Sequence, residues 1–129
     1  MAFNRRPGEW RVDALSGQIM DKMRTAKYTI GQVVKHRLFS FRGVIFDIDP
    51  VFNNTDEWWQ AIPAEIRPHK DQPFYHLFAE NAETEYVAYV SEQNLLPDTS
   101  GAPIRHPEVA EVFVRDDSGS YRQRHSQLN

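Results

Sequence analysis

Two aspartates separated by a single residue, Asp47 and Asp49, are the first candidates for chemistry in this sequence. Alternate residues of a strand point to the same face, so both carboxylates would lie together, where they can share a Mg²⁺ ion or a proton. No third ligand or phosphate-binding loop accompanies them in the sequence, and Pro50 directly after Asp49 is typical of a turn at a strand end. We therefore favour a solvent-facing strand end, with neither catalytic nor metal-binding residues.

The histidines do not show the spacing of a zinc site, because no i, i+4 pair and no HExxH motif occurs among His36, His69, His76, His106 and His125. His76 lies in an aromatic run, which is typical of a packed, hydrogen-bonded histidine. The absence of cysteine excludes disulfides, thiolate metal sites and cysteine nucleophiles. The motifs GxSxG, GxGxxG and GxxxxGK[ST] are also missing. The sequence thus predicts a protein that is not an enzyme and needs no cofactor.

Cationic side chains gather at one place in the middle of the chain, interleaved with phenylalanines, and they are Lys35, His36, Arg37 and Arg42. Basic side chains can contact phosphates while neighbouring aromatic rings stack on bases. Residues 27–97 nevertheless carry six Lys or Arg against ten Asp or Glu, whereas a DNA-binding domain is usually basic. On the residues alone, a solvated hairpin with an apolar inner face is favoured over DNA contact.

Trp58 and Trp59 are adjacent, and two neighbouring side chains in a loop cannot easily both face one core. Tryptophan is enriched at the hot spots of protein interfaces, so the pair is a candidate site for a protein partner. The alternative is a loop that folds back as a lid over an open barrel end. The residues leave both interpretations open.

The elements that must position these side chains are short strands. Alternating apolar and polar residues predict strands over 33–38, 44–49, 74–78 and 84–90. Residues 51–72 form a long connection between the second and third strands, and Thr55 is placed to cap one helical turn within it. Few helical patterns occur, so we expect an all-β protein with a small antiparallel barrel or a highly twisted sheet.

The chain of 129 residues is long enough for one ordinary domain, and we place that domain at residues 27–97. Residues 1–26 are expected to be an extension that is flexible or forms a short helix; a native start at Met20 or Met23 is the alternative. Residues 98–129 are expected to be a tail with a short helix near 107–113, begun by Pro107.

The composition, with 40% hydrophobic and 26% charged residues, is that of a folded protein rather than a disordered one. No apolar run approaches the roughly 18–20 residues that a membrane helix needs. No apolar stretch follows Arg5 and Arg6, so a secretory signal is not expected. These features predict a cytoplasmic protein with no membrane partner.

Four ordered segments, residues 30–39, 41–50, 71–77 and 84–95, resemble the HspQ family, also called the YccV-like or hemimethylated-DNA-binding protein family. The resemblance covers about residues 27–97. It implies a compact SH3-like β-barrel, to which the residue pattern adds the long loop between strands two and three and the short helical appendages. The family is associated with binding of hemimethylated origin DNA, and with a heat-shock role in which members act as specificity-enhancing factors for the Lon protease.

This resemblance implies a non-enzymatic stress factor that binds protein partners and promotes Lon-dependent proteolysis of selected substrates, including the replication initiator. Trp58 and Trp59 are then the candidate contacts to Lon or its substrates. The alternative is a module that recognises hemimethylated DNA at the replication origin through the cationic residues named above, together with arginines near the N-terminus. A homo-oligomer, paired through an exposed barrel edge, is also left open.

Overall fold

The computed structural model describes residues 26–124. The helical pattern of the predicted N-terminal extension therefore lies outside the described residues. Within the described part of the chain, no helix is long and apolar enough to cross a membrane.

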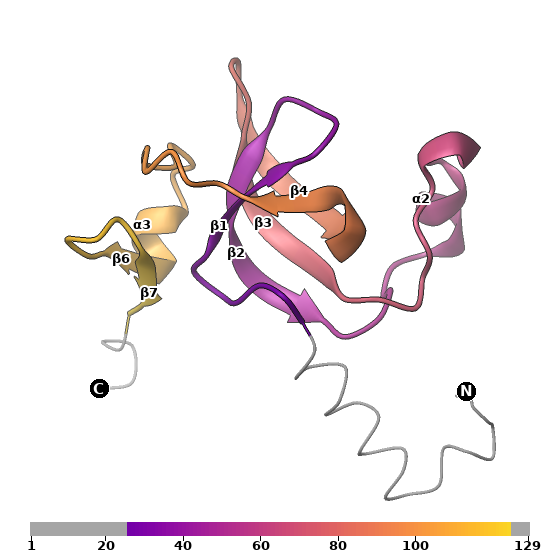
Figure 1. Ribbon diagram of the computed structural model, residues 1–129, viewed down its shortest axis with the longest axis horizontal. Coiled ribbons are helices and arrows are strands. Elements are labelled where there is room, and N and C mark those ends of the chain that lie inside the picture. Colours follow the sequence, from indigo (N-terminus) through magenta and orange to yellow (C-terminus); the bar gives the residue numbers. More distant parts are fainter. Residues whose placement is uncertain (1–25, 125–129) are drawn as a thin grey trace, which may run out of the picture.

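Five antiparallel strands form the main sheet in the order β4-β3-β2-β1-β5 (Figure 1). Their bounds are β1 Val33–His36, β2 Arg42–Asp49, β3 Phe74–Glu80, β4 Glu85–Ser91 and β5 Leu95–Pro97. The first four strands follow one another along the sheet, and a 3-10 turn, η3 (Glu92–Asn94), returns the chain so that β5 pairs with β1. The predicted all-β class is confirmed.

The sheet curls around one apolar cluster. The cluster takes buried side chains from all five strands, including Val34, Ile45, Leu77, Val90 and Leu95. Strands at opposite ends of the sheet order can share one core only if the sheet bends back on itself, as an SH3-like barrel does. Among the described residues no strand pairing joins β4 to β5, so hydrogen bonding leaves this barrel open between its two edge strands.

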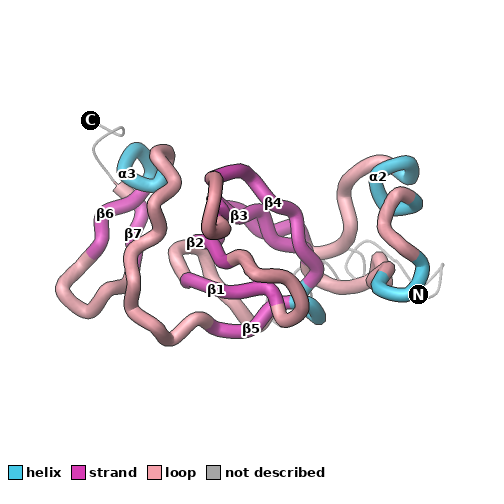
Figure 2. Tube along the Cα trace, turned by 90° about the horizontal axis from the view of Figure 1, so that it is seen from above, coloured by secondary structure: helices cyan, strands magenta, loops and turns pink. Residues whose placement is uncertain are grey.

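The C-terminal segment covers the opposite face of β2 and β3. It contains helix α3 (Val109–Val112) and a two-stranded hairpin of β6 (Phe113–Arg115) and β7 (Tyr121–Gln123), which lie beside β2 in Figure 2. Since side chains alternate along a strand, β2 and β3 send a second set to this face, and these pack with the segment in a second cluster: Val44, Phe78, Ile104, Val109, Phe113 and Tyr121.

Gly31 shows how closely this segment approaches the sheet. Its φ is +94°, a conformation that side chains disfavour, and a Cβ added there would lie 2.3 Å from the backbone oxygen of Tyr121. Its N–H donates to the oxygen of Ile45 at 2.8 Å. A residue without a side chain is therefore required where β7 contacts the turn before β1.

The connection between β2 and β3, residues 50–73, contains helix α2 (Asp56–Gln60) and a 3-10 turn, η2 (Ala64–Ile66). We refer to residues 50–73 as the insertion. The predicted cap is confirmed, because the Thr55 hydroxyl accepts from the Trp58 N–H at 3.0 Å. Figure 1 shows α2 standing away from the sheet, so the insertion forms a separate wall beside it.

Candidate functional site

The loop between β1 and β2 presents two large apolar side chains to solvent. Leu38 is 50% exposed and Phe39 is 52% exposed. His36 supports both, because its Nδ1 accepts from the N–H groups of Leu38 and Phe39, each at 3.0 Å. Its ring stacks on Phe39 with 4.7 Å between centroids. Burial lowers the pKa of His36, and the charge of Arg37 lowers it further. His36 is therefore held as a neutral ring that shapes the loop.

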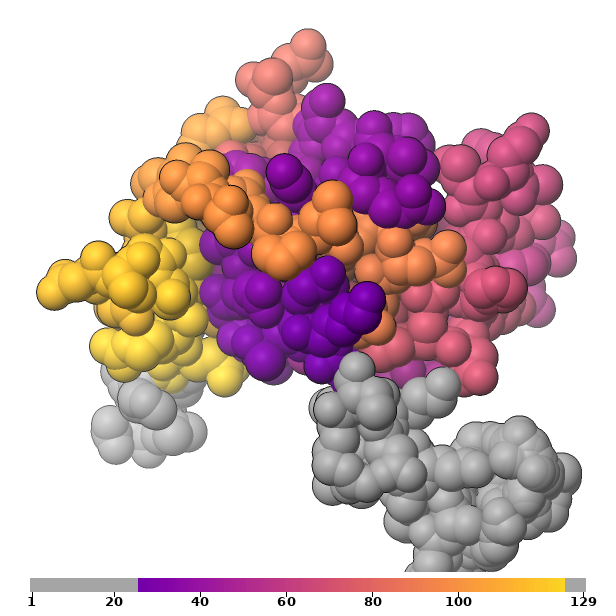
Figure 3. Space-filling model, viewed as in Figure 1, coloured from indigo at the N-terminus to yellow at the C-terminus, as the bar shows by residue number. Residues whose placement is uncertain are grey.

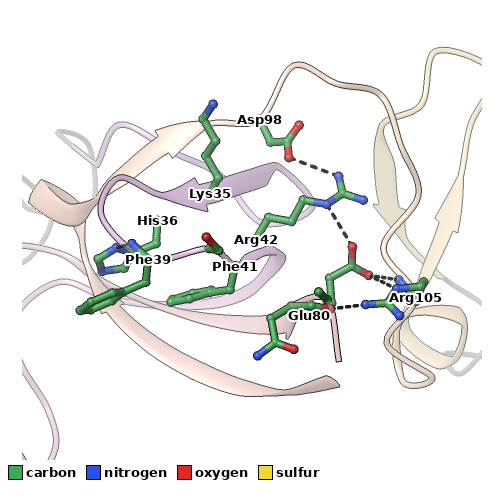
Figure 4. A pocket seen from close by; sticks show the side chains of 11 residues that line it. Lys35, His36, Phe39, Phe41, Arg42, Glu80, Asp98 and Arg105 are labelled. Carbon is green, nitrogen blue, oxygen red and sulfur yellow. Dashed lines mark hydrogen bonds and ion pairs between the residues drawn. The ribbon is translucent and has the colours of Figure 1, made fainter. Parts of the chain in front are cut away.

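The guanidinium of Arg42, another of the cationic candidates, forms hydrogen bonds and ion pairs within the fold (Figure 4). Its Nε donates to Glu80 at 3.0 Å and its Nη1 to Asp98 at 3.2 Å. In the segment after β5, Nη1 also donates to the Ser100 hydroxyl and the Ala102 oxygen, and Nη2 donates to the Pro103 oxygen. We call this set the Arg42 clamp, and it ties β2 to β3 and to the C-terminal segment.

The two carboxylates of the Arg42 clamp are held ionised. Burial alone would raise the pKa of Glu80, but hydrogen bonds from Arg105 and Arg42, and the charge of Arg42, lower it. Burial would likewise raise the pKa of Asp98, but hydrogen bonds from Ser100 and the Arg42 guanidinium lower it. Arg105 also pairs with Glu80, at 3.1 Å, so two guanidiniums face the two carboxylates. The Arg42 guanidinium is held in the fold by these contacts, which leave one Nη2 N–H without a partner among residues 26–124.

Lys35 and Arg37 are the two exposed cations of this loop region. The Lys35 side chain has no hydrogen bond or ion pair within residues 26–124, while Arg37 Nε donates to the oxygen of Gln93 and to Asn94 Oδ1. The structure thus separates the four predicted DNA-contact residues into two that position the fold, His36 and Arg42, and two that face solvent.

The two adjacent tryptophans lie in different environments. Trp59 belongs to the insertion itself, because its Nε1 donates to the oxygen of Pro68 at 2.9 Å. Its ring is covered by the Arg67 guanidinium at 4.8 Å and the Lys70 ammonium at 4.6 Å. These contacts fold the insertion onto Trp59, which therefore holds this wall together.

Trp58 instead faces the sheet, with its ring 5.4 Å from that of Tyr89 and 5.9 Å from that of Phe52. It lines a groove of about 250 Å³, which we call the apolar groove. Apolar side chains from the β1–β2 loop, the insertion and β4 form its walls: Leu38, Phe39, Phe41, Trp58, Ile62, Ile66, Tyr86 and Ala88. Figure 3 shows the loop (purple) and the insertion (pink) beside each other on one face of the molecule.

Asp47 and Asp49 acquire a neighbour that sequence analysis missed. A bulge between Ile45 and Asp47 shifts the register so that Asp47 pairs with His76 of β3. The ligand atoms of Asp47, Asp49 and His76 lie within 4.8 Å of one another, close enough to share a cation. His76 was expected only as a packed histidine; the strand register that brings it to the aspartates is long-range and leaves no motif.

Side chains of this cluster are already hydrogen-bonded within the protein. Asp49 Oδ2 lies 3.0 Å from His76 Nε2 and accepts from the Tyr89 hydroxyl at 2.8 Å. The Tyr89 oxygen in turn accepts from the Asn53 N–H at 2.8 Å. Burial raises the pKa of Tyr89, and the hydrogen bond to Asp49 raises it further. The network therefore joins β2, β3, β4 and the start of the insertion, and it positions the wall that carries Trp58.

Comparison with known proteins gives the family. A family model described as hemimethylated DNA-binding protein YccV-like matches residues 26–120. F-box only protein 21 of Mus musculus is 32% identical over 94 residues, which are 72% of this chain and 14% of that protein. The human F-box only protein 21 is 31% identical over 94 residues, with the same two shares. The chain thus spans about one seventh of these relatives. Since the model matches most of the chain, the resemblance found in the sequence is confirmed, and the chain belongs to the YccV-like hemimethylated DNA-binding protein family.

Proposed function

We propose that this protein is a non-enzymatic cytoplasmic stress factor that binds protein partners and promotes Lon-dependent proteolysis of selected substrates. The apolar groove carries the proposal. Leu38 and Phe39 are each half exposed beside it, and burying such side chains against a partner is favourable at roughly 25 cal/mol per Å² of apolar surface. The role with Lon and in heat shock rests on the resemblance of residues 30–50 and 71–95 to the HspQ family.

Charge also favours a protein ligand for this part of the molecule. Residues 26–124 contain ten Lys or Arg and fifteen Asp or Glu. The affinity for a nucleic acid comes mostly from neutralised phosphates, whereas a protein ligand can bind through apolar contacts at a surface with a net negative charge.

Degradation by purified Lon, with a replication initiator protein as the substrate, tests the proposal. We expect the wild-type chain to accelerate degradation and Phe39→Ser to abolish the acceleration. Val87→Ser is the matched control, because Val87 is 56% exposed on β4 but does not line the apolar groove. An unchanged degradation rate with wild type, or equal rates with both variants, would contradict the proposal.

Binding of hemimethylated DNA is the second candidate function, and the family match favours it. Lys35 and Arg37 are the exposed cations that support it. Fluorescence anisotropy should compare hemimethylated with unmethylated duplexes at low and physiological salt. If these side chains contact phosphates, Lys35→Gln and Arg37→Gln each reduce the log–log salt slope by about one.

Lys70→Gln is the control for these two variants, because Lys70 is paired with Asp56 at 2.9 Å on the insertion. Binding that ignores methylation, disappears at physiological salt and responds equally to all three variants would exclude this candidate.

A further inference from the structure

Ser91 is a buried polar residue in the wall of the apolar groove. It is only 2% exposed, it lines the groove, and its hydroxyl has no hydrogen-bond partner in the described part of the chain. A buried hydroxyl without a partner is unfavourable, since it has lost water and gained nothing in exchange. The lining is mostly apolar, with His36 and Asn94 as further polar members, and the hydrogen bond of the Ser91 hydroxyl is left for the main chain of a bound polypeptide.

The wall formed by the insertion carries uncompensated negative charge. Its two cations are engaged, because Arg67 donates to the oxygens of Gln60 and Ile62 while covering Trp59, and Lys70 pairs with Asp56. Glu57 and Glu65 are exposed and have no ion pair within residues 26–124. Glu57 lies on α2 with Trp58, and Glu65 lies on η2 with Ile66, so both glutamates are on the two elements that supply the insertion's groove-lining residues.

The third wall is an edge of the sheet. β4 is the first strand in the sheet order and, within residues 26–124, pairs with β3 alone, while its Tyr86 and Ala88 line the groove. An extended segment can lie along such an edge with alternate side chains directed into the groove.

We propose that the apolar groove binds an extended segment of another polypeptide in which apolar residues are followed by Arg or Lys. The apolar side chains contact Trp58, the main chain hydrogen-bonds to the Ser91 hydroxyl, and the basic residue lies against Glu57 and Glu65. This inference rests on the proposed function, because it defines the ligand of the same protein-binding site.

Binding of two labelled, capped hexapeptides to the full-length chain tests the inference. Both peptides begin with four alternating leucines and valines; one ends with two arginines and the other with two glutamates. We expect anisotropy at low salt to show at least fivefold tighter binding of the arginine peptide. The Glu57→Gln, Glu65→Gln double variant should remove this preference. The double variant Glu108→Gln, Glu111→Gln is the matched control, since these exposed carboxylates lie at the opposite face near α3.

Ser91→Ala separates a ligand contact from a structural role. It should weaken binding of the arginine peptide at least threefold while the melting temperature stays the same or rises, because the variant removes an unpaired buried hydroxyl. Binding without a charge preference, or unaffected by Ser91→Ala, overturns this ligand assignment.

The remaining outcomes distinguish the two proposals. If neither peptide binds but Phe39-dependent acceleration of Lon persists, the ligand assignment is wrong and the proposed function stands. If neither peptide binds and Lon is not accelerated, both are wrong. Displacement of the arginine peptide by duplex DNA would assign the groove to nucleic acid. A dimer in sedimentation that excludes the peptide would assign it to a second copy of this chain. Either result would overturn the inference.

Discussion

The guanidinium of Arg42 and the carboxylate of Glu80 form an ion pair with 3.0 Å between Nε and Oε2, and both side chains are largely buried. Removing one member of such a pair leaves a buried charge without its partner, which costs about 3–5 kcal/mol. We expect Arg42→Gln to lower the free energy of unfolding by about 3 kcal/mol, measured by urea denaturation. Lys35→Gln, at an exposed position, should change it by less than about 0.5 kcal/mol.

A small effect of Arg42→Gln on stability, together with a reduced salt slope in DNA binding, would contradict this assignment. It would return Arg42 to the set of phosphate contacts. The two measurements therefore decide whether this arginine serves the fold or a ligand.

The Arg42 clamp should also determine how the stability of the protein falls at acid pH. The folded pKa values of Glu80 and Asp98 lie below their ordinary values of 4.5 and 3.8. Their contribution to the free energy of unfolding is therefore fully present at pH values above these ordinary pKa values, and it is lost as the pH falls through the lower folded pKa values. We expect urea midpoints to fall below about pH 4.5 in wild type, and to fall less steeply in Arg42→Gln. Parallel acid limbs would exclude the clamp as their cause.

His36 predicts a separate dependence on pH. Its folded pKa lies below the ordinary value of 6.5, so the unfolded chain binds the proton first and stability falls as the pH drops below about 6.5. Protonation also removes the Nδ1 acceptor that orders Leu38 and Phe39. Peptide affinity at the apolar groove should fall across the same range.

His36→Gln removes this titration. Histidine ring signals in NMR report the pKa of His36 directly, and comparison with the variant assigns them. Equal pH dependence of peptide binding in wild type and in His36→Gln would show that another group is responsible.

Gly31→Ala should be strongly destabilising because the new Cβ would lie 2.3 Å from the Tyr121 oxygen in a left-handed conformation. We expect a loss of at least about 2 kcal/mol in urea denaturation. Gly101→Ala is the matched control: its φ is +78°, but no atom of the described residues lies within 4 Å of the added Cβ, so only the conformational cost of about 1 kcal/mol applies. Equal losses would show that the contact with β7 does not matter.

The tryptophans should respond differently to substitution. Trp58→Ala removes a groove wall, and we expect at least tenfold weaker binding of the arginine peptide. Trp59→Phe removes the hydrogen bond to Pro68 and should leave peptide affinity within twofold while lowering thermal stability. Anisotropy and thermal melting, measured on both variants, check this division. Similar losses of affinity and stability in the two variants would make the pair a single structural unit.

The strands β1 to β4 could be predicted because each has enough alternating residues to define its faces. β5, β6 and β7 have three residues each, too few for a periodic pattern, and their pairing depends on distant segments. The same limit applies to side chains. The sequence marks Trp58 and Trp59 as unusual, but only the fold brings one to Tyr89 and the other to Pro68.

Arg42 gives the clearest case of a role that local sequence cannot predict. It stands in a basic, aromatic run, yet its acidic partners follow 38 and 56 residues later. Ser91 likewise ends an apolar strand without any motif, and only the packing around it leaves its hydroxyl unpaired.

Neither of the two apolar clusters includes a side chain from residues 50–73. Those residues nevertheless supply one wall of the apolar groove and the acidic groups beside it. Changes of length and charge in this one connection therefore leave the packing of both apolar clusters untouched. A different ligand preference can then arise from a single loop while the curled sheet beneath it keeps its fold.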